Sequence, residues 1–203
     1  MRRDDAAPER PWHAWRVARP LRIQVDGGTY HVNAHAIANA ALFRDDDDRR
    51  RFLALLERAV SAHEWACHAY CLMTTHYHLL IHTPDASLAD GMKWLNGAYA
   101  QGLNRRHGTR GHVFESRYYS TLIEQEAHLL ESLRYVVNNP VLAGVCADAA
   151  AWPWSSYGAW MGTVQRPPFL AVAWVLSHFG MDVERARERL REFISNGIRR
   201  AVA

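Results

Sequence analysis

The sequence has little of what marks a secreted or membrane-spanning protein. Its three cysteines are odd in number and form no CxxC pair, so a disulfide framework is not expected. It also lacks an apolar run of roughly 18 residues, and its first residues, Met-Arg-Arg-Asp-Asp, are not those of a secretion signal. These absences predict a soluble, cytoplasmic protein without a membrane partner.

Lysine is nearly absent as well. Lys93 is the only lysine, and arginine supplies the other basic residues. The formal net charge is +3, so the chain as a whole attracts polyanions only weakly. Arginine nevertheless suits phosphate recognition, because its planar guanidinium group donates several hydrogen bonds. With 203 residues, 49% of them hydrophobic, the chain can form one sizeable domain and an extension.

Hydrophobic periodicity and turn residues predict an α+β fold. Strands are expected at four places, residues 30–36, 65–73, 77–82 and 120–124. Helices are expected at three places, residues 45–63, 87–106 and 125–139. The order strand, helix, strand, strand, helix, strand, helix is typical of a ferredoxin-like (RRM-like) split βαβ sandwich.

Two further segments flank this domain, which is expected over residues 21–160. Residues 1–20 contain three prolines and two tryptophans, which predicts an irregular N-terminal arm. Residues 166–203 predict a C-terminal helical extension with helices at 170–179 and 183–194. Arginines alternate with acidic residues in the second of these helices, as on a solvated face.

Two helix starts carry polar signals. The acidic run Asp45–Asp48 allows a metal site, but it is more typical of a solvated helix N-terminus, where the macrodipole favours negative charge. The helix at 87–106 is expected to be capped by the side chain of Asp85 or Ser87.

The third expected strand carries two histidines on one face. Side chains of a strand alternate, so His76 and His78 point to one side while Tyr77, Leu79 and Ile81 point to the other. Two neutral imidazoles with Cα atoms about 7 Å apart can bind a divalent ion if further ligands come from elsewhere. The alternative is a pair of surface histidines in a chain that has 12 histidines.

The helix expected at 125–139 has an apolar and a polar stripe. The apolar stripe consists of Leu129, Leu130, Leu133, Val136 and Val137. The polar stripe consists of His128, Glu131, Ser132, Tyr135 and Asn139. Pro140 disfavours helix at the residue before it, which puts Asn139 at the end of the helix. Tyr135 is either a surface tyrosine or a phenol that faces the histidine pair, with Asn139 as an oxygen ligand.

Residues 104–119 form the most basic stretch of the chain. It carries four arginines against one acidic residue and ends in two tyrosines: Arg105, Arg106, Arg110, Arg117, Tyr118 and Tyr119. Arginines with interleaved aromatic residues suit a nucleic-acid backbone and its unstacked bases. A solvated loop is the alternative.

The ordered set of these motifs resembles a known family. His76-Tyr77-His78, followed by Tyr135-Val-Val-Asn-Asn139-Pro140, resembles the single-tyrosine HUH transposases, in particular the IS200-like, REP-associated tyrosine transposases of bacteria. The similar region runs from about residue 20 to 157 and includes Phe43-Arg44-Asp45, residues 111–119 and Trp152-Pro-Trp-Ser-Ser-Tyr157.

The resemblance implies an HUH endonuclease fold and a set of roles. It implies that His76, His78 and Asn139 bind Mg²⁺ or Mn²⁺ and that Tyr135 attacks DNA, with single-stranded DNA next to a REP-like hairpin as the partner. Similar proteins often have Asn or Asp just before the first histidine, where this chain has Thr75. Whether residue 75 supports the His76 ring is therefore open. The segment 35–39 also differs from the Arg-Gly-Asn run that is usual in the branch.

Three functions remain open at this point. The leading one is a metal-dependent single-stranded DNA endonuclease and strand transferase that forms a 5′-phosphotyrosine. The others are a catalytically silent hairpin-binding protein and a zinc hydrolase in which Tyr135 is incidental. Intact Tyr135, His76 and His78 favour the first. Glu131 is a candidate base by spacing only, and a homodimer that shares active sites is left open.

Overall fold

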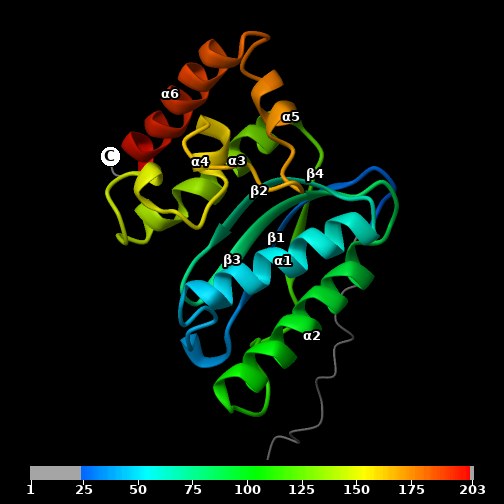
Figure 1. Cartoon of the computed structure of the whole chain (residues 1–203). Helices are drawn as coiled ribbons and strands as arrows, with labels where there is room; N and C mark the ends of the chain where they lie inside the picture. Colours follow the sequence, from blue (N-terminus) through cyan, green and yellow to red (C-terminus); the bar gives the residue numbers. More distant parts are fainter. Residues whose placement is uncertain (1–23, 202–203) are drawn as a thin grey trace, which may run out of the picture.

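A single antiparallel sheet organises the molecule. The structure is a computed structural model that describes residues 24–201, so the arm expected at 1–20 lies outside the described residues. The four-stranded sheet has the order β2-β3-β1-β4 (Figure 1). Its strands are β1 (Thr29–His35), β2 (Ala66–Leu72), β3 (His76–His82) and β4 (Tyr119–Ile123).

Helices lie between and after the strands at the expected positions. The main helices are α1 (Asp46–Ala62), α2 (Leu88–His107) and α3 (Glu126–Leu142). Shorter or later ones are η1 (Ile37–Asn39), η2 (Ala149–Ala151), α4 (Tyr157–Met161), α5 (Val172–Ser177) and α6 (Val183–Ala201). The order β1-α1-β2-β3-α2-β4-α3 and the strand order confirm the predicted α+β, ferredoxin-like fold.

One face of the sheet is apolar and is covered by α1 and α2, which run side by side (Figure 1). Tyr77 of β3 is fully buried there, and its ring centroid lies 4.7 Å from that of Phe52 on α1. Phe52 in turn meets Tyr99 of α2 at 5.2 Å. Full burial of a side chain such as Phe52 stabilises the fold by about 1.5–3 kcal/mol. This face therefore anchors β3 and leaves the opposite face for other side chains.

The opposite face carries the histidines and is covered by α3. Residues of β1 that alternate with the buried Val32 and Ala34 point to this side, as do His76 and His78 of β3. We refer to it as the histidine face. Because α3 packs against β2 and β3, its side chains are held over this face.

Two predicted details of the helix ends are wrong. Ser87 is the N-cap residue of α2, as one of the two expected candidates, but its side chain does not cap the helix; its hydroxyl accepts a hydrogen bond from the Trp65 indole at 2.9 Å. Gln24 replaces it in this role: its side-chain oxygen accepts the Ala89 N–H at 2.7 Å. Helix α3 also continues past Asn139 to Leu142, with Pro140 inside it, so the proline does not end the helix at the residue before it.

The C-terminal extension packs onto the domain. Both expected helices are present, as α5 and α6. The outer edge of β2 is covered by main-chain hydrogen bonds, from Leu72 N–H to the Trp154 carbonyl at 2.8 Å and from Ala171 N–H to the Cys67 carbonyl at 2.9 Å. The Asn138 amide donates to the Ile194 carbonyl at 2.9 Å, which ties α3 to α6. No helix within residues 24–201 is long and apolar enough to cross a membrane.

Candidate active site on the histidine face

His76 and His78 of β3 lie at the end of the sheet where β1 ends. In the antiparallel register His35 pairs with His76 and Asn33 pairs with His78. The rings of His76 and His78 meet edge to face, with centroids 5.0 Å apart. The alternation that the sequence predicted therefore holds, and both imidazoles lie on the histidine face.

Helix α3 brings Tyr135 and Asn139 to these histidines. The Asn139 side-chain oxygen lies 3.4 Å from Nε2 of His76. The Tyr135 ring meets the His78 ring at a centroid distance of 5.5 Å and the His31 ring at 5.7 Å. Tyr135 thus faces the histidines of its own chain, and 45% of the residue remains exposed, so a large substrate can reach the phenol.

The Nδ1 nitrogen of each of these two histidines has a hydrogen-bond partner. Nδ1 of His76 lies 3.1 Å from the Thr75 hydroxyl, so the unusual residue at this position does support the ring. Nδ1 of His78 lies 3.0 Å from Nε2 of His31 on β1. Hydrogen bonds of this kind fix the orientation and tautomer of ligand histidines.

Burial keeps these imidazoles neutral. It lowers the pKa of His78 to about 2 and that of His31 to about 4, with repulsion from neighbouring histidines adding to the effect. The pKa of His76 is lowered for the same main reason, while its hydrogen bond with Asn139 acts in the opposite direction. Neutral imidazoles keep a lone pair for a metal ion. Two of them with an amide oxygen form a donor set that fits a divalent cation such as Mn²⁺ or Mg²⁺.

The two tyrosines of the basic stretch lie on opposite faces of the sheet. Tyr119 pairs with Asn33, which pairs with His78, so these three residues form one row across the histidine face. Since neighbouring strands lie about 4.8 Å apart, Tyr119 is about 10 Å from His78. Tyr119 is 59% exposed, whereas Tyr118 is 4% exposed and belongs to the core. Of the two, only Tyr119 offers an open ring face.

The arginines of the basic stretch also differ in their surroundings. Arg105, Arg110 and Arg117 are exposed. Arg117 lines a pocket of about 680 Å³ between α2 and residues 111–118. Arg106 instead donates to Asp45 at 2.6 Å and to Asp48 at 2.5 Å. Its guanidinium group is therefore already engaged.

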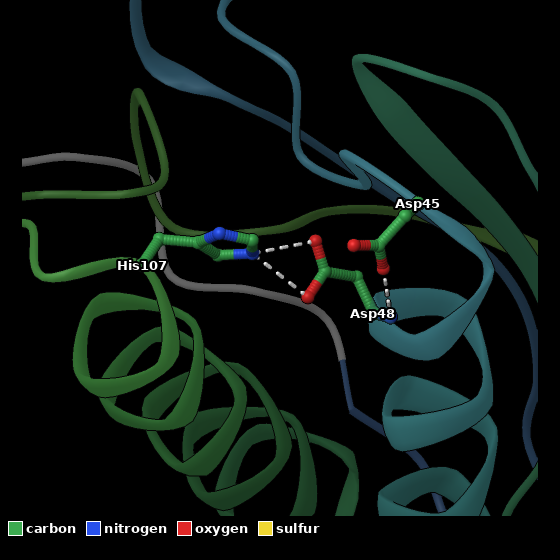
Figure 2. A group of neighbouring side chains, drawn as sticks. All are labelled: Asp45, Asp48 and His107. Atoms are coloured by element: carbon green, nitrogen blue, oxygen red, sulfur yellow. Dashed lines mark hydrogen bonds and ion pairs between the residues drawn. The ribbon is translucent and has the colours of Figure 1, made fainter.

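A second cluster of potential ligands joins the start of α1 to the end of α2. Ligand atoms of Asp45, Asp48 and His107 lie within 4.8 Å of one another (Figure 2). Asp48 is fully buried and accepts from Nε2 of His107 at 3.0 Å and from the Arg44 N–H at 3.0 Å. Because Arg106 already supplies positive charge to both carboxylates, this group is an interhelical ion-pair cluster that we call the acidic cluster.

The prediction that Asp45–Asp48 form a solvated helix N-terminus is therefore only partly confirmed. Asp45 accepts the Asp48 N–H at 3.0 Å, which confirms the predicted helix N-terminus. The solvated interpretation is wrong for Asp48, which is buried under partners from α2. The sequence signal for the capping was the spacing of the two aspartates, but nothing local indicated Arg106 or His107.

Glu131, the candidate base, is not brought to Tyr135. Its carboxylate forms an ion pair with Arg134 one helical turn away. Within residues 24–196 no hydrogen bond joins the Glu131 carboxylate to the Tyr135 phenol.

Comparison with known proteins places this site in context. A family model described as "Transposase IS200 like" matches residues 24–139, more than half of the chain. A putative REP-associated tyrosine transposase from Haemophilus influenzae is 26% identical over an alignment of 115 residues, and the match covers 48% of this chain and 65% of that protein. The chain thus spans slightly less than two thirds of the length of this curated relative.

A solved structure has the same fold. It is described as a REP-associated tyrosine transposase bound to a REP hairpin, and it superposes with a TM-score of 0.62 at 14% sequence identity. The match covers 76% of this chain and 91% of the other. Together with the family match, this confirms the resemblance that the sequence motifs indicated.

Proposed function

We propose, on the premise that the chain belongs to the IS200-like transposase family, that it cleaves and rejoins single-stranded DNA with Tyr135 as the nucleophile. The observation that carries the proposal is the position of the Tyr135 ring, 5.5 Å from His78 on the histidine face of the same chain. A tyrosine that only stabilised the fold would be expected to be buried. Tyr135 is instead 45% exposed, beside imidazoles that are buried and neutral.

His76, His78 and Asn139 are the residues that would hold Mg²⁺ or Mn²⁺. A divalent cation bound there supplies positive charge to the phosphate oxygens of the DNA. Thr75 and His31 keep the two imidazoles oriented, and Asn139 is 7% exposed, so its amide has little freedom to turn away.

Tyr135 performs the covalent step. Its phenol oxygen forms a bond to phosphorus while the bond from phosphorus to the 3′ oxygen breaks. The phenol proton leaves to a base, and the departing 3′ oxygen takes up a proton, which gives a 5′-phosphotyrosine and a free 3′-OH. Attack by a 3′-OH on the phosphotyrosine reverses the exchange and joins strands, so no external energy source is needed.

Exposed side chains on the histidine face and beyond the end of α2 provide contacts for the strand. Tyr119, in one row with His78 at about 10 Å, can stack on a base close to the scissile phosphate. Arg105, Arg110 and Arg117 are exposed and free to contact phosphates, whereas Arg106 is held by the acidic cluster. The solved relative is bound to a REP hairpin, so we propose a hairpin with a single-stranded flank as the substrate.

Trapping experiments test this function against its alternatives. The protein is incubated with Mn²⁺ and a hairpin oligonucleotide whose single-stranded flank is labelled at its 3′ end. A label that stays on the protein after denaturation supports the proposal, since the 5′-phosphotyrosine carries the 3′ fragment. Binding of the hairpin without cleavage indicates the silent binding protein. Cleavage without a covalent adduct indicates a hydrolase that uses water.

A further inference from the structure

His31 lies at the centre of the candidate site, although no motif points to it. It alternates on β1 with the buried Tyr30 and Val32, so its ring lies on the histidine face. Its Nε2 is 3.0 Å from Nδ1 of His78, and its ring centroid is 5.7 Å from that of Tyr135. One side chain therefore contacts both a proposed metal ligand and the proposed nucleophile.

We propose that His31 is a positioning residue that holds His78 in its metal-binding orientation and tautomer by accepting a hydrogen bond from Nδ1–H of His78. This inference rests on the proposed function, because it assigns His31 to the support of that same site. It adds a residue from β1 to a site whose other members come from β3 and α3.

The direction of the hydrogen bond follows from the chemistry of imidazole. Between two neutral imidazoles, one nitrogen must donate and the other must accept. If His78 binds a cation through Nε2, that nitrogen has no proton, so the proton of His78 is on Nδ1. His31 must then accept through Nε2 and carry its own proton on Nδ1.

The two proposed histidine ligands form hydrogen bonds with different residues. The Thr75 hydroxyl, from the adjacent residue, lies 3.1 Å from Nδ1 of His76. His78 has no such neighbour on its own strand, and its partner comes from β1, where His31 is diagonal to it in the strand register. Diagonal residues on paired strands are within reach of long or aromatic side chains. His35 only stacks on His76, with centroids 4.6 Å apart.

Two variants of His31 separate a hydrogen bond from packing. His31→Phe keeps a ring next to Tyr135 but removes the acceptor, whereas His31→Gln keeps a polar acceptor near the position of Nε2. His128→Gln is the matched control, because His128 is an exposed histidine on α3. The affinity of each DNA-free protein for Mn²⁺ is measured by electron paramagnetic resonance, together with its thermal midpoint.

The expected result is a 10–100-fold weaker Mn²⁺ affinity for His31→Phe, as for other partners of ligand histidines. His31→Gln should bind Mn²⁺ nearly as well as the unmodified protein, and so should His128→Gln. Unchanged affinity in folded His31→Phe would overturn the inference. Equal losses in the Phe and Gln variants would overturn it too, because they would assign the effect to packing.

A measurement on the unmodified protein keeps the inference testable even if a variant does not fold. Long-range ¹H–¹⁵N NMR of the metal-free protein reports which nitrogen of each histidine carries the proton. We expect Nδ1–H for both His78 and His31, and Nε2–H on His78 would contradict the assignment. Neither this spectrum nor Mn²⁺ affinity needs DNA, so a failure here is distinct from the absence of a covalent adduct, which would reject the proposed function.

Discussion

Two clusters at the same end of the sheet contain similar residues but differ in charge. The histidine face places His76 and His78 beside the amide of Asn139, with no cationic side chain among their hydrogen-bond partners within residues 24–196. The acidic cluster places Asp48 and His107 together (Figure 2). It also contains Arg106, which forms an ion pair with Asp48. Both clusters have nitrogen and oxygen donors within a short distance.

The difference shows how an internal cation changes what a cluster can bind. The Arg106 guanidinium occupies the oxygens that a metal ion would need, so the acidic cluster satisfies its own charge and ties α1 to α2. The Nδ1 atoms of the histidine pair are occupied by neutral partners, and Nε2 of His76 lies 3.4 Å from the Asn139 amide oxygen, so no internal cation competes for these donor atoms. Proximity of donors alone therefore does not distinguish a metal site from a structural contact.

The largest effect is expected from loss of a histidine ligand. His78→Ala should lower the yield of the covalent DNA adduct by at least about 100-fold, because only one imidazole and an amide would remain. Hairpin affinity should largely persist, since phosphate and stacking contacts provide most of it. Adduct yield is measured by denaturing electrophoresis, with His107→Ala of the acidic cluster as the control that keeps activity. Adduct formation that persists in EDTA would show that the reaction does not need a bound metal ion.

A change in the acidic cluster should affect stability instead. Asp48→Asn leaves Arg106 and His107 with a neutral partner and should lower the free energy of unfolding by about 2 kcal/mol. Urea unfolding measures this loss. Mn²⁺ affinity should stay the same. A large loss of Mn²⁺ binding would mean that the acidic cluster, and not the histidine pair, binds the metal ion.

The comparison extends to the two tyrosines before and within β4. Tyr119→Ala should weaken binding of the single-stranded flank by about 1–3 kcal/mol, which is the range for one stacked base. Tyr118→Ala should mainly reduce stability, because Tyr118 is buried in the core. Fluorescence anisotropy with a labelled oligonucleotide, combined with thermal unfolding, separates the two effects. Equal DNA affinities for folded Tyr119→Ala and the unmodified protein would reject the stacking role.

The last effect is a difference in pH dependence. His31 and His78 have lowered pKa values in the folded state, so the unfolded state binds more protons and stability falls as pH drops below about 6.5. Each buried histidine contributes up to about 1.4 kcal/mol per pH unit in that window. In the acidic cluster, Arg106 holds the pKa of Asp45 below its usual 3.8, so its contribution is lost only as pH falls below about 4.

Urea unfolding of the metal-free protein between pH 7 and 3 measures both windows. In His31→Phe the slope between pH 6.5 and 4.5 should be smaller, while the loss below about pH 4 should remain. An unchanged slope in this variant would show that His31 does not titrate abnormally in the folded protein.

The main parts of the fold and site could be predicted because their signals are local. Strand alternation predicts that His76 and His78 share a face, and helical spacing predicts that Tyr135 and Asn139 do. That these two pairs meet follows from α3 packing across β3, which the resemblance, and not the periodicity, implied.

The supporting residues could not be predicted because they depend on contacts far apart in the sequence. His31 reaches His78 only through the pairing of β1 with β3, and Arg106 reaches Asp48 only because α1 and α2 lie side by side. Alternation along β4 required Tyr118 and Tyr119 to point to opposite faces, but not which of them is buried. The preference against helix before a proline did not predict the end of α3 either, because the helix continues through Pro140 to Leu142.

The identity of the residue that becomes linked to DNA tests the central claim most directly. The unmodified protein and Tyr135→Phe are incubated with Mn²⁺ and the 3′-labelled hairpin oligonucleotide, and the adduct is digested and analysed by mass spectrometry. We expect a phosphotyrosyl nucleotide on the peptide that contains Tyr135, and no adduct from the Phe variant although it still binds the hairpin. An adduct on another residue, or one that forms equally well with Tyr135→Phe, would contradict the assignment of Tyr135 as the nucleophile.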